Sequence, residues 1–465
     1  MIQKVLIIVP HPDDEINLAG GLYDVFKKNN VFTTVVFCTN GDYYPEYAQT
    51  RHQEVLNAKN VLGYDEAIFL GYGDGLLDSN IYNIDEDIVI KSPAGYEETY
   101  STGSEPEFCF KKNNTHHKYT RRNLKNDIQD VILEKKADLI ICVDLDCHYD
   151  HRCISLLFDE GIGEILKSNS NYRPIILKGF AYMGAWAGKD DFFSSTVKPM
   201  FPTIDRTHKD PSCTFPHPWE ERVRIKNSKN TTTIKLWNNC IFRALLSHRS
   251  QIRFASSSDN ALAKFPSIAN PESCYWLRRS DNLLLNSIVS ATSGNVCYLN
   301  DFKIFDTCGV YNKDIYTKEL GWTPSIGDKL KEITIQFSNQ QSINHIIIYQ
   351  GRTTNIMEVR IATKDGVFET FRFNNKPGDA LHIKVHYITS LLKLQITRAE
   401  IENICIHEIE CYSKYDNSIL DLYPLTNYPD KQRKNPLIIT PLMGKIFHII
   451  VDLILEYNRY ILKRN

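Results

Sequence analysis

Strand and helix patterns alternate along residues 1–181, and this alternation restricts the fold more than any other feature. Short β-branched runs predict buried strands at 4–9, 32–38, 67–70, 139–143 and 175–181. Amphipathic stretches between them predict helices at 16–28, 51–62, 122–135 and 154–166. A chain of this kind folds as an α/β domain with a doubly wound, mainly parallel, Rossmann-like sheet. Ligands of such sheets bind beyond the carboxyl ends of the strands.

The pattern changes after about residue 258, where helical periods give way to short alternating runs separated by Gly, Asn, Asp and Pro. Many short strands at regular spacing predict an all-β sandwich. A length of 465 residues also agrees with two or three domains. The predicted division is an α/β domain at 1–257, a linker at 258–281, a β-sandwich at 282–413 and a tail at 414–465.

The tail contains a predicted amphipathic helix at 444–463, in which polar residues recur at intervals of three or four. Charged side chains in its middle argue against a membrane-spanning segment. Packing onto one of the domains is the favoured interpretation of its apolar face. Peripheral contact with a membrane or a partner is the alternative.

Composition excludes several classes of protein. A net charge of −2 gives no electrostatic reason to expect nucleic acid as a partner. The first ten residues lack the pattern of a signal peptide, so a cytoplasmic location is expected, with the inner face of the membrane as a peripheral variant. The 12 cysteines form no Cys-x-x-Cys pair, which indicates reduced thiols rather than a disulfide framework or a zinc ribbon.

Two polar motifs follow predicted strands and should therefore meet at one edge of the sheet. The first is Pro-His-Pro-Asp-Asp-Glu at 10–15, directly after strand 4–9. The second is Asp-Cys-His-Tyr-Asp-His at 146–151, after strand 139–143. Acidic residues that merely begin a helix would explain 13–15. They would not explain the prolines or the histidines.

The residue types in the two motifs are those that bind zinc. A catalytic zinc ion needs three protein ligands and one open position for water, and its ligands are His, Cys, Asp and Glu. His11, Asp14 and His151 supply that number. Asp13 is then free to handle protons. His148 and His151 stand three residues apart, so one of them can complete the zinc site while the other faces the substrate.

This pairing of motifs resembles the PIG-L/LmbE-like zinc-dependent de-N-acetylases, over about residues 1–255. The resemblance implies one Zn²⁺ per chain, held by His11, Asp14 and His151. It implies that Asp13 is the general base and that His148 stabilises the oxyanion or assists the leaving amine. One departure is Asp146, where some relatives carry a tyrosine.

The same resemblance suggests residues that contact the substrate. Arg51 and Glu54, on the predicted helix 51–62, match a family pattern and are expected to line the sugar pocket. Asp74 is similar to a residue that bonds sugar hydroxyls. The segment 247–251 resembles a late family segment and marks the end of the domain. The polar stretch at about 91–120 is unmatched and is expected to cover the site.

The implied activity is zinc-dependent hydrolysis of the acetamide of an N-acetylated amino sugar of the N-acetylglucosamine type. A nucleotide-linked or lipid-linked precursor in glycan or glycolipid assembly is the expected substrate. Two other hypotheses stay open. One is a zinc amidase with a different acyl substrate, and the other is a non-catalytic carbohydrate-binding protein on the same scaffold.

The predicted sandwich resembles galactose-binding-like or discoidin-like modules, both where it opens (282–293) and where it closes (406–411). This resemblance implies a glycan ligand or an anchoring role. Trp322 and Tyr349 are candidates for stacking on sugar rings, with core aromatics as the alternative. A purely architectural domain is the other hypothesis.

Overall fold

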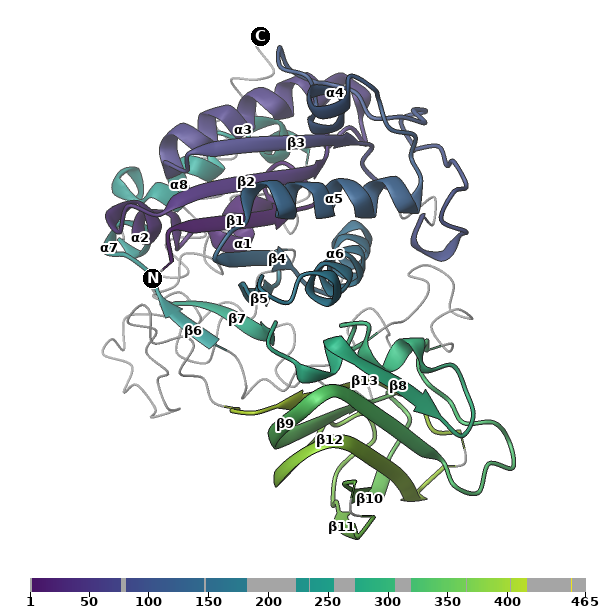
Figure 1. The fold of residues 1–465 in the computed structure, drawn as a ribbon. Helices are drawn as coiled ribbons and strands as arrows, with labels where there is room; N and C mark the ends of the chain where they lie inside the picture. The colour runs from purple at the N-terminus through teal and green to yellow at the C-terminus, as the bar shows by residue number, and fades with distance from the viewer. Residues whose placement is uncertain are drawn as a thin grey trace.

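The structure is a computed structural model (Figure 1) that describes residues 2–76, 81–145, 148–181, 223–233, 235–254, 272–305, 319–364, 366–401 and 403–415, together with Leu453. The predicted tail helix at 444–463 lies outside the described residues, except for Leu453. None of the helices within these ranges has the length and apolar character needed to cross a membrane.

The N-terminal unit is built on a seven-stranded sheet in the order β3-β2-β1-β4-β5-β7-β6. The strands are β1 Lys4–Val9, β2 Phe32–Thr39, β3 Glu66–Tyr72, β4 Leu139–Val143, β5 Ile175–Gly179, β6 Val223–Lys226 and β7 Glu272–Arg279. The first five are parallel, whereas β7 runs antiparallel to both β5 and β6. The predicted doubly wound, mainly parallel sheet is therefore confirmed.

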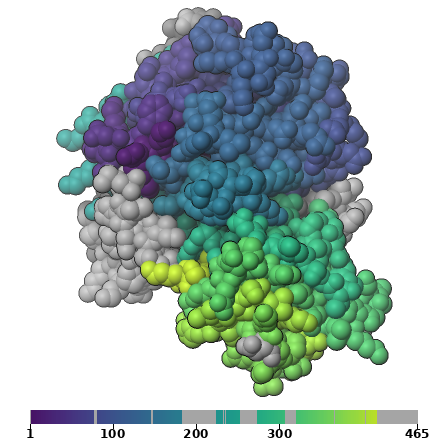
Figure 2. Space-filling view, viewed as in Figure 1, coloured from purple at the N-terminus to yellow at the C-terminus, as the bar shows by residue number. Residues whose placement is uncertain are grey.

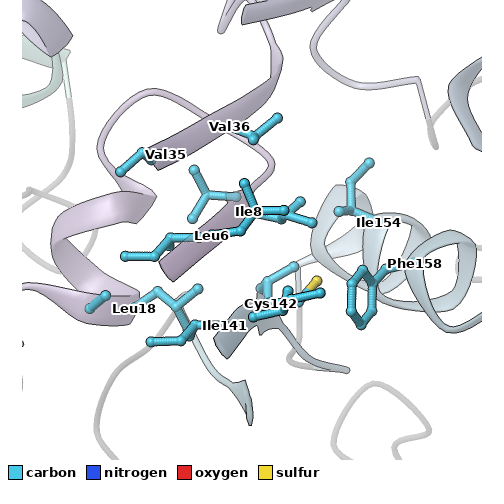
Figure 3. Packing of buried hydrophobic residues seen from close by; sticks show 14 of the residues in the cluster. Leu6, Ile8, Leu18, Val35, Val36, Ile141, Cys142, Ile154 and Phe158 are labelled. Atoms are coloured by element: carbon cyan, nitrogen blue, oxygen red, sulfur yellow. The ribbon is translucent and has the colours of Figure 1, made fainter. Parts of the chain in front are cut away.

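Helices cover this sheet on both sides (Figure 1). They are α1 Asp14–Ala19, α2 Tyr23–Lys28, α3 Ala48–Leu62, α4 Phe108–Asn113, α5 Arg121–Lys135, α6 Tyr149–Ser168, α7 Lys229–Thr232, α8 Cys240–Leu245 and α9 Arg249–Phe254. Buried side chains of the strands, of α1 and of α6 interlock in the core, among them Leu6, Ile8, Leu18 and Phe158 (Figure 3).

Three local expectations were wrong. The single helix predicted at 16–28 is two helices, α1 and α2, because the chain turns at the glycine pair 20–21. A Cβ on Gly21 would lie 2.3 Å from the Asn227 side chain, so this glycine permits a close approach of the two segments. The polar stretch at 91–120, in which no helix or strand was predicted, contains α4 and an isolated bridge between Glu98 and Lys118. The third concerns the strands of the second unit.

The second unit is all-antiparallel, with the strand order β11-β10-β12-β9-β13 and β8 paired to β9. Its strands are β8 Ser287–Ala291, β9 Glu332–Gln350, β10 Ile356–Ala362, β11 Phe368–Arg372, β12 Leu381–Ala399 and β13 Ile406–Tyr412. The predicted all-β sandwich is confirmed. However, β9 and β12 are each 19 residues long and not the short strands that were expected, since their backbone ladder continues through β-bulges and polar residues.

Trp322 belongs to the core of the sandwich. Its side chain is fully buried, and its Nε1 donates a hydrogen bond to the carbonyl oxygen of Ser293 at 2.8 Å. A ring in this position cannot stack on a ligand, so the interpretation of Trp322 as a core aromatic is the correct one. Tyr349 is half-buried, and its hydroxyl donates to Glu410 at 3.2 Å.

The two units are in contact (Figure 2), and β7 supplies part of that contact. This strand lies inside the predicted linker 258–281, so part of that range belongs to the sheet. Arg278 of β7 donates from Nη1 to Oε1 of Glu410 at 3.0 Å and from Nη2 to the carbonyl oxygen of Phe302 at 2.7 Å. Although Arg278 falls within the predicted linker, it is only 2% exposed, because its partners come from the second unit.

Candidate metal centre and active site

The two polar motifs lie side by side at the carboxyl edge of the sheet. Residues 10–13 connect β1 to α1, whose first two residues complete the motif, and His148 is the N-cap residue of α6 after β4. Strands β1 and β4 pair directly in parallel, so their following loops must meet. The edge predicted from the sequence is therefore where the structure brings these residues together.

Three side chains converge at this edge. Oδ2 of Asp14 lies 3.0 Å from Nδ1 of His11 and 3.1 Å from Nε2 of His151. All three side chains are buried, with His151 only 1% exposed. The ligand atoms of His11, His148 and His151 also lie within 4.8 Å of one another.

These separations fit a bound metal ion. Ligand bonds of about 2.0–2.1 Å at tetrahedral angles place neighbouring ligand atoms about 3.3 Å apart. The distances around Asp14 Oδ2 are close to that value, and two imidazoles with one carboxylate are ligands that zinc accepts. His11, Asp14 and His151 would thus hold a metal ion with little rearrangement.

The second ring nitrogen of His11 meets two further carboxylates. Its Nε2 lies 2.9 Å from Oδ2 of Asp150 and 3.1 Å from Oδ1 of Asp74. The backbone N–H of Gly75 donates to the same Asp150 oxygen at 2.8 Å. A carboxylate on the far nitrogen of a ligating histidine fixes its ring orientation and tautomer. Asp150 was part of the predicted motif without a role, and the structure gives it this one.

Contacts between the histidines and the carboxylates shift the pKa values at the centre. Burial opposes the charged form of His11, but Asp74, Asp14 and Asp150 outweigh it and raise the His11 pKa well above its ordinary value. Burial likewise opposes ionisation of Asp14, yet His151 and His11 hold the pKa of that carboxyl well below its usual range. Ionised carboxylates beside imidazoles favour binding of a cation.

Asp13 has a strained backbone. Its φ of 114° lies in the left-handed region that side chains rarely adopt, and its N–H donates to Oε2 of Glu15 at 2.8 Å. Such strain costs about 1–3 kcal/mol and persists only where surrounding contacts impose it. The Asp13 side chain is turned toward Arg51, whose Nη2 lies 3.5 Å from Oδ1.

Arg51 ties together the loops that follow the strands. Its Nη1 donates to the carbonyl oxygen of Gly41 at 3.0 Å, and its Nη2 donates to that of Pro12 at 2.5 Å. Nη1 also lies 3.5 Å from Oδ2 of Asp74. Gly41 has a φ of +63°, and a Cβ there would lie 2.6 Å from the guanidinium, so only glycine fits. Contact of Arg51 or Asp74 with a substrate stays a prediction.

His148 lies at the open side of the centre. Its ring centroid is 4.8 Å from that of His11 and 4.6 Å from that of His151, and its side chain is half-buried. A histidine beside a candidate metal and near solvent is placed to exchange a proton with a bound group.

Several supporting residues were not predicted from the sequence. Asp42 accepts from the N–H of Asp74 at 2.7 Å and from the hydroxyl of Tyr100 at 2.6 Å, so the stretch 91–120 does contact the site. Glu54 was assigned to the sugar pocket, but its carboxylate accepts from N and Oγ of Ser250 at 2.7 and 2.6 Å. The resemblance of segment 247–251 to a family segment was the signal that could have indicated the contact between Glu54 and Ser250.

Comparison with known proteins gives one family. The PIG-L family, described as GlcNAc-PI de-N-acetylase, matches residues 6–161, which include both motifs. No curated protein matches the chain.

Several solved structures are similar to parts of the chain. N,N'-diacetylchitobiose deacetylase from Pyrococcus horikoshii is 19% identical over 38% of this chain, with a TM-score of 0.26, and the match spans only 60% of the deacetylase. A family 32 carbohydrate-binding module from Clostridium perfringens, in complex with galactose, is 15% identical over 27% of this chain and 92% of the module, with a TM-score of 0.21. A chitosan-binding module from Paenibacillus is 16% identical over 28% of this chain and 98% of the module, with a TM-score of 0.22.

At these identities and TM-scores, assignment of the first unit depends on the family match and on the two motifs at the sheet edge. The chain therefore carries a PIG-L domain at residues 6–161.

Proposed function

We propose that this chain is a zinc-dependent sugar N-deacetylase, which hydrolyses the acetamide of an N-acetylglucosamine-type sugar to acetate and a free amino sugar. The observation that carries the proposal is the convergence of His11, Asp14 and His151, with Asp13 and His148 beside them. The description of the matched family names the same reaction on a GlcNAc-containing lipid.

The chain's own residues supply ligands and proton transfer. His11, Asp14 and His151 would hold one zinc ion, which polarises an acetamide carbonyl and acidifies water when it is bound. Asp13 lies next to these ligands in the sequence and is oriented by Glu15 and Arg51, so it is the residue that accepts the proton of the attacking water.

His148 completes the proton transfer. Its half-buried ring at the open side of the centre can donate to the oxyanion or to the departing amine. Acetate formation needs one proton taken from water and one given to nitrogen, and Asp13 and His148 supply these two roles from separate side chains. Arg51 and Asp74 are proposed to position the sugar.

The proposal also covers the carrier of the sugar and the ligand of the β-sandwich. A nucleotide-linked or lipid-linked precursor in the cytoplasm remains our proposal, as does a glycan ligand on the β-sandwich. Likeness of the sandwich to carbohydrate-binding modules is consistent with a saccharide ligand, although the fold is shared by domains of other function.

Acetate release from a panel of acetamido sugars tests the function. Free, nucleotide-linked and lipid-linked sugars would be compared with the wild-type protein, with Asp13→Asn and with a chelated sample. We expect acetate from at least one sugar, loss of at least about 100-fold in Asp13→Asn, and loss on chelation that zinc restores. Equal release by wild type and Asp13→Asn would rule out the mechanism, and release of a different acyl group would favour the amidase hypothesis.

A further inference from the structure

A cavity lies outside the metal centre. It has a volume of about 850 Å³ and is lined by α3 on one side and by the corner between α8 and α9 on the other. Helices α3 and α8 are in direct contact (Figure 1). None of the side chains at the metal centre lines this cavity, so its chemistry needs an explanation of its own.

Two arginine side chains and one carboxylate line this cavity. Arg243 and Arg249 line it, are exposed, and form no ion pair within the part of the chain that the structure describes. The carboxylate in the same wall is that of Glu54, which is buried and accepts both of its hydrogen bonds from Ser250. Two exposed guanidinium groups that line one cavity are suited to an anionic ligand, since their planar N–H groups bind phosphate or carboxylate in pairs.

An exposed aromatic ring stands beside this charge. Trp237 lines the cavity and is 70% exposed, while its ring contacts Phe242 edge-on at 5.7 Å between centroids. Trp276 and Trp322, by contrast, are buried. A large amphipathic ring that lines a mainly apolar cavity is suited to packing against the face of a sugar ring.

The loop at 41–47 connects the metal centre to the cavity. At its start Gly41 accepts from Arg51, and at its end Tyr47 lines the cavity. Between these points Tyr43 and Tyr44 are 50% and 57% exposed. A saccharide that extends from the metal centre along this loop would therefore meet exposed aromatic rings and then the arginines.

We propose that this cavity is a second saccharide subsite, which binds an anionic unit linked to the acetamido sugar. The anionic group, a sugar phosphate or a uronic acid carboxylate, lies between Arg243 and Arg249, and its ring packs on Trp237. The proposal rests on the proposed function, because it assigns a neighbouring unit of the same substrate.

Binding to the zinc-loaded full chain tests the subsite without turnover if Asp13→Asn is present in every sample. Three probes would be titrated calorimetrically: N-acetylglucosamine 1-phosphate, a disaccharide of N-acetylglucosamine and glucuronic acid, and neutral di-N-acetylchitobiose. We expect the better anionic probe to bind at least about tenfold more tightly than the neutral one. The phosphate and carboxylate probes distinguish the two sources of charge.

Matched variants separate the subsite from general electrostatics. Arg243→Gln/Arg249→Gln should abolish the preference for the anionic probe, and Arg243→Lys/Arg249→Lys should retain part of it. Lys229→Gln/Lys235→Gln removes the same charge from exposed positions that do not line the cavity and should leave the preference within about twofold. Trp237→Ala should weaken the binding of all three probes.

The outcomes distinguish this inference from the proposed function. Equal binding of neutral and anionic probes, or an unchanged preference in the glutamine pair, overturns the subsite even if wild type releases acetate. A preference that the glutamine pair abolishes supports the subsite even if no acetate is released, in which case the proposed reaction is the part that fails.

Discussion

Nε2 of His248 lies 3.0 Å from Oε1 of Glu15, and both side chains are fully buried although 233 residues separate them. The other carboxylate oxygen of Glu15 accepts from the N–H of Asp13 at 2.8 Å. The turn between α8 and α9 thereby supports the strained residue that we propose as the general base.

Replacement of His248 should therefore impair catalysis from a distance. His248→Ala leaves the Glu15 carboxylate buried without its partner, which costs about 3 kcal/mol of unfolding free energy. Asp13 should lose its orientation, so kcat for acetate release should fall at least about tenfold, with a smaller change in KM. His248→Gln keeps a donor and should recover part of both. The exposed His386→Ala is the control, and full activity in His248→Ala would contradict the coupling.

Strain at Asp13 predicts that two variants with the same loss of activity differ in stability. Asp13→Gly and Asp13→Ala should both lose at least about 100-fold in kcat, because each lacks the base. Asp13→Gly should nevertheless be the more stable by about 1 kcal/mol in denaturant unfolding, since glycine adopts a φ of 114° without a Cβ penalty. Equal stability of the two variants would show that the backbone relaxes when the carboxylate is removed.

Metal removal should lower stability as well as activity. A ligand at about 100 times its Kd stabilises the folded chain by about 2.7 kcal/mol, so chelation should lower Tm measurably and zinc should restore it. His151→Ala should show no response of Tm to zinc, and metal analysis should find about one ion per wild-type chain. The exposed His386→Ala should behave as wild type. A zinc response retained in His151→Ala would place the metal elsewhere.

The interface between the two units contains a carboxyl group that should oppose folding at neutral pH. Burial, with the carboxylates of Asp301 and Glu410 nearby, raises the pKa of Glu408 well above its usual value, against the opposing effect of Arg278 and Lys167. The folded chain then holds this proton more tightly than the unfolded chain. The contribution of the Glu408 carboxyl to stability is greatest below its pKa in the unfolded chain, about 4.3. It is lost as pH rises through its pKa in the folded chain.

Glu408→Gln should remove that dependence. Relative to wild type, the variant should be more stable at pH 8 by about 1 kcal/mol or more, and the difference should shrink toward pH 5, as measured by denaturant unfolding. Glu410→Gln, the matched control, should be destabilising at both pH values because it breaks the pair with Arg278. A stability difference for Glu408→Gln that does not change with pH would show that Glu408 is ionised in the folded chain.

Sequence reasoning predicted the centre of the site because that part depends on short-range rules. His11 and His151 follow strands of a parallel sheet, and carboxyl ends of such strands meet at one edge. The same rules predicted both fold classes, since the periods of the two halves differ.

Contacts between distant segments were beyond those rules. The sequence around His248 does not indicate that its partner is Glu15. Likewise, the sequence around Glu54 does not indicate that its carboxylate accepts hydrogen bonds from Ser250. Arg278 lies in the range predicted as a linker, and arginine is rarely buried without a partner. Its partners lie in the unit that follows it along the chain, so the burial of Arg278 depends on contact between the two units.

That burial has a consequence for modularity. A β-sandwich that follows an enzyme along the chain resembles an appendage that could be removed or exchanged. Arg278 belongs to β7 of the α/β sheet but finds its carboxylate and its carbonyl on the other unit. A chain cut after residue 281 would keep the charge and lose both acceptors, so the first unit could not be separated as a finished domain. Any exchange of the sandwich would therefore have to bring a new partner for this arginine.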